Sequence, residues 1–352
     1  MKRFLHIAAL LLLAVSCEIP FDLDQAGEPK IYVQAIVKGA HVHIVPLVAN
    51  SVTGAPVADA PMEIRVELNG ASLPVHPEDS ISYAASSRLL REGDEISVTV
   101  RSGSLAPVTG STHFPPALVV EDFSWERVQV DTIDAVQVAI KLDHEPGEGE
   151  YYGIRILQQD YMIFPSVVQK AFYRYITPGY VLTADEIGGF DLEDFVQVNY
   201  DDHYLGGRDY QPLTLVTRKQ FDGDTYRFYL NSFDASILNG IREGMPGGNT
   251  GVAGGGIISG DIHPSEGGTG TEGFPDAPIG CRTIFHITLY RLSPEFYFFA
   301  KALYQSNFDF LANMGLIPAN FTWSNVEGGM GFVGAISSYS PDPIDFTEYF
   351  QK

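Results

Sequence analysis

The side chains with the greatest chemical capacity in this 352-residue chain gather between residues 185 and 210. Asp201, Asp202 and His203 are adjacent there, and five further carboxylates precede them. Carboxylate oxygens suit Ca²⁺, but the spaced Asp-x-Asp-x-Asp-Gly loop of a calcium site is missing. Two carboxyl groups in one cleft, roughly 5–10 Å apart, could instead hydrolyse a glycosidic bond. Because the chain has 44 acidic residues, a solvated acidic loop explains the same residues more simply.

Three tyrosines lie within or beside the same segment. Aromatic rings can stack on a sugar or on another flat ligand, and rigid β scaffolds commonly present binding residues on loops. If this segment contacts a ligand, we expect the contact residues to be Tyr200, Asp201, Asp202, His203, Tyr204 and Tyr210.

The signatures of the common catalytic families are absent from the chain. Residues 268–273 fit Gly-x-Gly-x-x-Gly, but no strand precedes them and they run into Pro275 rather than a helix, so they predict no dinucleotide site. His41 and His43 share one strand face and could serve a metal, yet no third ligand is identifiable. Cys281 has no histidine with which it can be paired. The sequence therefore predicts no catalytic residue, no metal and no cofactor, and favours a protein that is not an enzyme.

The N-terminus has the layout of a secretory signal. Two basic residues precede a run of 12 residues, Phe4–Val15, that is apolar apart from one histidine and too short to span a bilayer. Ala14-Val15-Ser16-Cys17 resembles the lipobox of bacterial lipoproteins, in which the cysteine becomes the first residue and carries a diacylglycerol. We therefore expect residues 1–16 to be a signal peptide and Cys17 to be a lipid attachment site that holds the protein stably on a membrane.

The composition excludes other classes of protein. A net charge of −22 repels the phosphate backbone, so we expect no nucleic-acid partner. A hydrophobic content of 45%, with 12% aromatic residues, excludes wholesale disorder. Once Cys17 is lipidated, Cys281 has no partner for an intramolecular disulfide.

The elements that would position these residues are mainly β-strands. Residues 17–29 lack periodicity and are typical of a tether between lipid and fold. Short period-2 segments separated by Gly, Pro and Asn then predict an immunoglobulin-like β-sandwich over residues 30–116, with a hairpin turn at Asn69-Gly70. Residues 117–352 predict a larger β-rich domain with strands near 136–142, 154–156, 226–230 and 285–289, and with a stretch at 166–176 that fits either a strand or a helix.

Three regions of the second domain depart from this strand pattern. Residues 185–210 predict long loops, and residues 241–280 hold 13 glycines with few large apolar side chains, which predicts a mobile loop. Ser293 as N-cap, Pro294 at the first helical position and apolar residues at helical spacing predict a helix near 294–307 that packs on the β domain.

Segments at the two ends of the mature chain resemble one catalogued family. They are Cys17-Glu18-Ile19-Pro20, Ile31–Ile36, Leu292–Tyr297 and Asn325–Ala335. They resemble the Bacteroidota lipoproteins catalogued as domain of unknown function 4249. The resemblance implies a β-rich outer-membrane lipoprotein, often encoded near TonB-dependent transporters, without an established activity. It leaves the glycine-rich loop at 241–280 unexplained.

Together these observations predict a lipid-anchored binding or accessory protein of the outer membrane, on the cell surface or the periplasmic face. It would assist a TonB-dependent transporter in capturing a nutrient. Two alternatives stay open: a surface hydrolase that uses the acidic residues near Asp201, and a structural or adhesive lipoprotein of the envelope.

Overall fold

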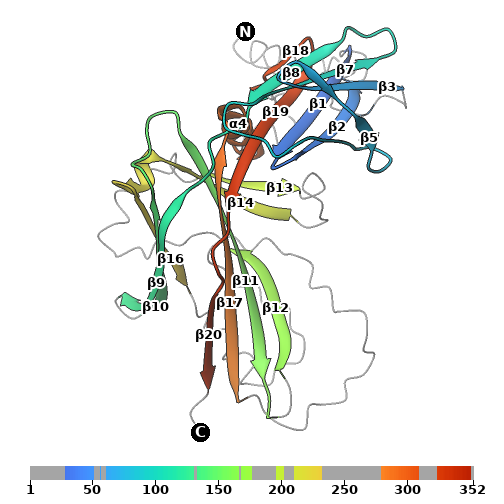
Figure 1. Cartoon of the computed structure of the whole chain (residues 1–352). Helices are drawn as coiled ribbons and strands as arrows, with labels where there is room; N and C mark the ends of the chain where they lie inside the picture. Colours follow the sequence, from blue (N-terminus) through green and yellow to red (C-terminus); the bar gives the residue numbers. More distant parts are fainter. Residues whose placement is uncertain are drawn as a thin grey trace, which may run out of the picture.

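The structure is a computed structural model and describes residues 28–50, 56, 61–130, 133–165, 168–176, 196–201, 210–231, 279–308 and 323–349. This part of the chain forms three sheets and one α-helix (Figure 1), which confirms the predicted mainly-β fold. The elements are, in chain order, β1 (Pro29–Lys38), β2 (His41–Asn50), β3 (Met62–Leu68), β4 (Ala71–Leu73), β5 (Val75–Pro77), β6 (Tyr83–Ser86), β7 (Glu95–Ser102), β8 (Val108–His113), β9 (Val120–Val130), β10 (Ile133–Leu142), β11 (Tyr151–Ile163), β12 (Val168–Ile176), β13 (Val196–Asp201), β14 (Tyr210–Thr217), the 3₁₀-helix η4 (Arg218–Gln220), β15 (Phe221–Asp222), β16 (Thr225–Asn231), β17 (Gly280–Leu292), α4 (Pro294–Phe308), β18 (Val326–Glu327), β19 (Met330–Tyr339) and β20 (Ile344–Tyr349).

One sheet runs through the whole molecule, and each of the other two sheets packs on a different part of it. The long sheet has 11 strands in the order β13-β14-β11-β17-β19-β1-β2-β6-β5, with β12 on β11 and β20 on β17. The upper sheet has the order β18-β8-β7-β3-β4, and the lower sheet has the order β15-β16-β10-β9. In Figure 1 the upper sheet lies at the top right and the lower sheet at the left, while β11, β12, β17 and β20 continue downwards between and beyond them.

The first sandwich packs the upper sheet against the part of the long sheet that contains β1 and β2. Alternate residues of β1, β3 and β7 face a shared core, as their period-2 patterns predict. The residues of these three strands that belong to this core are Ile31, Val33, Ala35, Val37, Val66, Leu68, Ile96, Val98 and Val100.

The Asn69-Gly70 turn joins β3 to β4 as predicted and is fastened to the start of β7. Both residues have positive φ, +49° and +78°, as a two-residue hairpin turn of this kind requires. The Asn69 side chain donates to Asp94 Oδ1 (2.8 Å) and accepts from the N–H of Glu95 (2.9 Å). Hydrogen bonds from the Arg88 guanidinium and from the backbone N–H of Arg91 hold the pKa of the Asp94 carboxyl well below its ordinary value. Asp94 therefore stays ionised and ties the turn to the neighbouring loop.

Residues 30–116 do not complete this sandwich by themselves. β19 pairs in parallel with β1, and β18 pairs with β8. Val326, Val333 and Ala335 of these C-terminal strands belong to the first core. The domain boundary expected at residue 116 therefore lies between strands that pair with each other, β1 with β19 and β8 with β18. Alternation in the sequence shows which face of a strand is buried, but not which distant strand lies beside it.

The strand β19 is held by a side-chain clamp and by a close backbone approach. The Asn325 amide donates to the carbonyl oxygens of Ser111 (2.8 Å) and Val333 (2.9 Å), and its oxygen accepts from the Val333 N–H (3.0 Å). Gly331, at φ +115°, lies so close to β1 that a Cβ there would stand 1.9 Å from the carbonyl oxygen of Val33. The asparagine and glycines at the end of the chain thus have a structural role.

The second sandwich packs the lower sheet against β14, β11, β17 and β20. The strand patterns predicted for residues 117–352 are confirmed here, since each contributes alternate residues to one core. The buried residues are Val136, Val138, Ile140, Leu142, Tyr152, Ile154, Ile156, Val216, Tyr226, Phe228, Leu230, Phe285, Ile287, Leu289 and Ile344.

The helix α4 covers the long sheet on the face opposite this second core. The predicted helix near 294–307 is confirmed, and Phe296, Phe299 and Ala300 are buried as its spacing indicates. They pack with residues of β1, β14, β17 and β19 in a third core. Because strand residues alternate, β17 can supply Leu289 to the second core and Tyr290 to the third.

The structure decides between strand and helix for the stretch near residues 166–176, and it contradicts the expectation of an uninterrupted loop over residues 185–210. Val168–Ile176 is a strand, β12, paired with β11. The long loop expected over residues 185–210 contains β13, whose Val196 and Val198 alternate with polar residues and pair with β14. Residues 241–278 of the glycine-rich segment and residues 17–27 of the expected tether lie outside the described residues.

Candidate binding surface

The residues predicted to contact a ligand are only partly described. Asp202, His203 and Tyr204 lie outside the described residues, so the Asp201–Asp202 carboxylate pair stays a prediction. Asp201 ends β13 and pairs with Tyr210, which begins β14. Tyr200, one position earlier in β13, pairs with Gln211 of β14. The β13–β14 hairpin therefore brings three of the predicted contact residues together at one end of two adjacent strands.

A second group of aromatic residues forms a defined surface beside this hairpin. We call it the aromatic surface: Tyr151, at the start of β11, Tyr297 and Phe298 of α4, and Trp323. The rings of Tyr151 and Tyr297 stack, with centroids 4.1 Å apart and planes at 16°. Phe298 lies edge-on to both at 5.4 and 5.5 Å, and Trp323 lies 6.1 Å from Phe298. Tyr297 is buried, whereas Phe298 is 39% exposed, so the group leads from the core to solvent.

The start of α4 is fixed by hydrogen bonds that the predicted N-cap makes. The Ser293 hydroxyl accepts from the N–H of Phe296 (3.3 Å) and from the N–H of Ala335 in β19 (3.1 Å). In the first turn of the helix, the Glu295 carboxylate accepts a hydrogen bond from the Thr112 hydroxyl of β8 (2.8 Å). The helix is thus tied to both sheets of the first sandwich, and the aromatic surface is held by the same contacts.

Buried aromatic rings also pack between the helix α4 and the strand β19. Phe299 stacks on Phe332 of β19 with centroids 3.9 Å apart, and Phe296 meets the same ring edge-on at 5.8 Å. The helix also contacts β13, so the aromatic surface lies near the β13–β14 hairpin, which carries some of the predicted contact residues. The arrangement offers an exposed ring on a rigid support, which suits ring stacking with a ligand.

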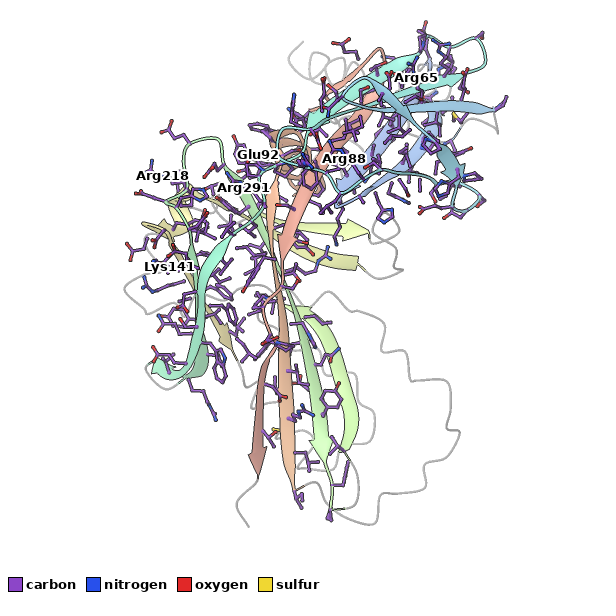
Figure 2. The ribbon with its side chains drawn as sticks, in the orientation of Figure 1. Arg65, Arg88, Glu92, Lys141, Arg218 and Arg291 are labelled. Carbon is purple, nitrogen blue, oxygen red and sulfur yellow. The ribbon has the colours of Figure 1, made fainter. Side chains whose placement is uncertain are left out.

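A network of ionisable groups lies at the upper end of the second sandwich, where Figure 2 labels Arg291. Arg291 of β17 is 9% exposed and forms an ion pair with Glu150. Glu150 also accepts from the N–H of Gly147 (2.9 Å) and from the hydroxyl of Tyr152 (3.3 Å). One carboxylate therefore joins the β10–β11 loop to two strands of the long sheet.

His144 stands between two carboxylates in the same network. Its Nδ1 lies 2.6 Å from Asp143 Oδ1, and its Nε2 lies 3.2 Å from Glu150 Oε2. The hydrogen bond with Asp143 raises the pKa of His144 against the opposing effect of burial. Partial burial raises the pKa of Glu150, but the Gly147 N–H, Arg291 and His144 outweigh it and lower that pKa overall. Both imidazole nitrogens are engaged, so this histidine holds a loop rather than standing free as a general base.

The remaining residues singled out in the sequence occupy separate places. His43 Nδ1 lies 2.6 Å from Glu78, and His41 Nδ1 lies 3.3 Å from the Ser86 hydroxyl. Within the described ranges no group of three His, Cys, Asp or Glu side chains could hold a metal ion. Cys281 is a half-buried cysteine near the start of β17. Of the helices in the part of the chain that is described, none is long and apolar enough to cross a membrane.

Sequence reasoning missed the aromatic surface because its members come from three distant segments. The helical spacing indicates which face of α4 is buried, but not which exposed ring meets side chains from other segments. Nothing in the spacing connects Tyr151 or Trp323 with α4. Pairing of β11 with β17, which leads directly into the helix, brings Tyr151 to Tyr297.

Comparison with known proteins identifies a family but no activity. No curated protein matches the chain. Among solved structures, that of manganese lipoxygenase of Gaeumannomyces graminis with part of zonadhesin of Komagataella pastoris has 9% identity and a TM-score of 0.19, covering 91% of this chain and 96% of that one. The B domain of a biofilm-associated protein has 7% identity and a TM-score of 0.17, covering 88% of this chain and 85% of that one. Similarity this low carries no argument about either protein's activity. The family described as a domain of unknown function, DUF4249, matches residues 17–341, and the chain belongs to this family.

Proposed function

We propose that the chain is a lipid-anchored, non-enzymatic binding protein of the bacterial outer membrane that assists a TonB-dependent transporter in nutrient capture. The observation that carries the proposal is the start of the family match at Cys17. This is the cysteine of the lipobox-like Ala14–Cys17 segment. A family unit that begins at the expected first residue of the mature chain supports lipidation at that position.

The tether and the rigid scaffold fit this role. The 12 residues from Cys17 to Glu28 could span at most about 40 Å when extended, which would allow the first sandwich to stand clear of the lipid headgroups. Beyond it, the aromatic surface presents an exposed ring on a packed helix. Exposed aromatic residues on a rigid support are common anchors of binding sites.

Replacement of Cys17 tests the anchor. We expect Cys17→Ser to lack acyl groups and to leave the membrane fraction, because a serine hydroxyl offers no thiolate for diacylglycerol transfer. The measurement is the intact mass of the purified protein, together with its partition between detergent and aqueous phases. The matched control is Cys281→Ser, which makes the same atomic change at a half-buried position in β17 and should retain lipid and membrane location. An acyl-free wild-type protein in the aqueous phase would refute the anchor.

A further inference from the structure

We infer that the aromatic surface binds a neutral saccharide, with one sugar ring stacked on Phe298 beside Trp323 and its hydroxyls between Glu295 and Lys301. The inference rests on the proposed function for its purpose, since it names the class of ligand that such a binding protein would capture. Its physical basis is independent of the membrane anchor.

The rings around Phe298 hold its side chain in place, so stacking on a ligand would cost little conformational entropy. The Phe298 ring centroid lies 5.4 and 5.5 Å from those of the stacked pair Tyr151 and Tyr297, and 6.1 Å from that of Trp323, whose plane is inclined at 31°. These neighbours restrict its rotamer, yet 39% of Phe298 stays exposed. A ring that is already fixed loses little conformational entropy when a ligand covers it. The C–H face of a pyranose is an apolar surface of about the size of such a ring.

Charged side chains stand on both sides of this ring along the helix. Glu295 lies three residues before Phe298 and Lys301 lies three residues after it, and residues at this spacing are neighbours on a helix surface. The Glu295 carboxylate is oriented by a hydrogen bond that it accepts from the Thr112 hydroxyl (2.8 Å). Among the described residues, none forms an ion pair or a hydrogen bond with the Lys301 side chain. A hydrogen-bond acceptor and a donor on opposite sides of an aromatic ring suit the hydroxyl groups of a sugar.

The charges indicate a neutral ligand rather than an anionic one. Glu295 and Lys301 cancel locally, so no net positive charge is available to an acid at this place. The chain as a whole carries −22, which repels polyanions that approach it. We therefore assign the surface to neutral sugars and expect saccharides that contain uronic acids to bind more weakly.

The chain supplies its own optical probe for this site. It contains two tryptophans, Trp323 at the aromatic surface and Trp125 on β9 of the lower sheet. In a Trp125→Phe background, the emission of the detergent-solubilised full chain comes from Trp323 alone. We would titrate this protein with maltohexaose, cellohexaose and mannohexaose, and with hexagalacturonate for comparison. A saturable shift with at least one neutral hexasaccharide, at a dissociation constant of about 1 mM or below, is the expected result.

Substitutions at the helix assign the binding to this place. We expect Phe298→Ala to weaken it about tenfold, because the stacking face is lost, while Phe298→Tyr retains it. Lys301→Gln should weaken it roughly fivefold, since a charged donor is lost. The control is Leu89→Ala, which removes a side chain that is 74% exposed on a different loop and should change nothing. Thermal unfolding of each variant verifies that it is folded.

Two results would overturn the inference: no shift with any neutral hexasaccharide, or equal affinity in the folded Phe298→Ala variant. Preference for hexagalacturonate would overturn the assignment to neutral sugars. Because the titration needs neither transporter nor bilayer, its failure would leave the anchor standing, and loss of the anchor would leave the titration interpretable.

Discussion

Gly331→Ala is expected to prevent stable folding, with a loss of at least about 4 kcal/mol in the free energy of unfolding. A Cβ at this position would lie 1.9 Å from the carbonyl oxygen of Val33 and 2.9 Å from its nitrogen. Val33 cannot retreat, because β1 lies between β19 and β2 and its side chain is 1% exposed in the first core. The φ of +115° adds backbone strain for any residue with a side chain.

The measurement is the yield of soluble protein together with urea unfolding of whatever accumulates. Gly147→Ala is the matched control, because Gly147 has no positive φ and a Cβ there meets no atom within 4 Å. It should change the free energy of unfolding by about 0.5 kcal/mol or less. A Gly331→Ala protein as stable as this control would show that β19 does not approach β1 as described.

Glu150→Gln is expected to destabilise the second sandwich by about 3 kcal/mol. The substitution keeps the size of the side chain but leaves Arg291, which is 9% exposed, without its opposite charge. A buried guanidinium without a counter-ion costs far more than a surface ion pair contributes. Glu148→Gln is the control, since Glu148 is exposed in the same loop and makes no described contact. Equal urea midpoints for the two variants would contradict the role of the pair.

The same network predicts a pH dependence of stability. Glu150 has a lowered pKa, so its contribution is complete above its unfolded value near 4.5 and is lost as the pH falls through the folded pKa. His144 has a raised pKa, so its contribution is complete below its unfolded value near 6.5 and is lost as the pH rises through the folded pKa. The difference in stability between wild type and Glu150→Gln should therefore be largest between these two values.

The strands and the helix followed from local patterns, whereas their assembly did not. Alternation in β1, β7, β10 and β17 predicts the buried faces, because one face of each strand meets a core. The Asn69-Gly70 turn and the Ser293 cap depend on neighbouring residues and are equally readable. The pairing of β1 with β19 joins residues about 300 positions apart, and no local pattern carries that information.

The candidate site was predictable only in the kind of residue involved. Aromatic side chains were expected to stack on a ligand, but the sequence pointed to Tyr200, Tyr204 and Tyr210 because they cluster in the chain. In the structure, the half-exposed aromatic group is formed instead by the touching rings of Tyr151, Tyr297, Phe298 and Trp323. Their proximity depends on tertiary packing around α4, which follows from the whole sheet rather than from any segment.

The proposal that the chain is a lipid-anchored protein working with a transporter is tested most directly by capture of its partners. The tagged full-length protein would be purified from detergent-solubilised outer membranes, beside the Cys17→Ser variant, and the accompanying proteins identified by mass spectrometry. We predict a TonB-dependent transporter in stoichiometric amount with the lipidated protein and its loss with Cys17→Ser. A lipidated protein that is recovered alone would contradict the claim of a stable complex.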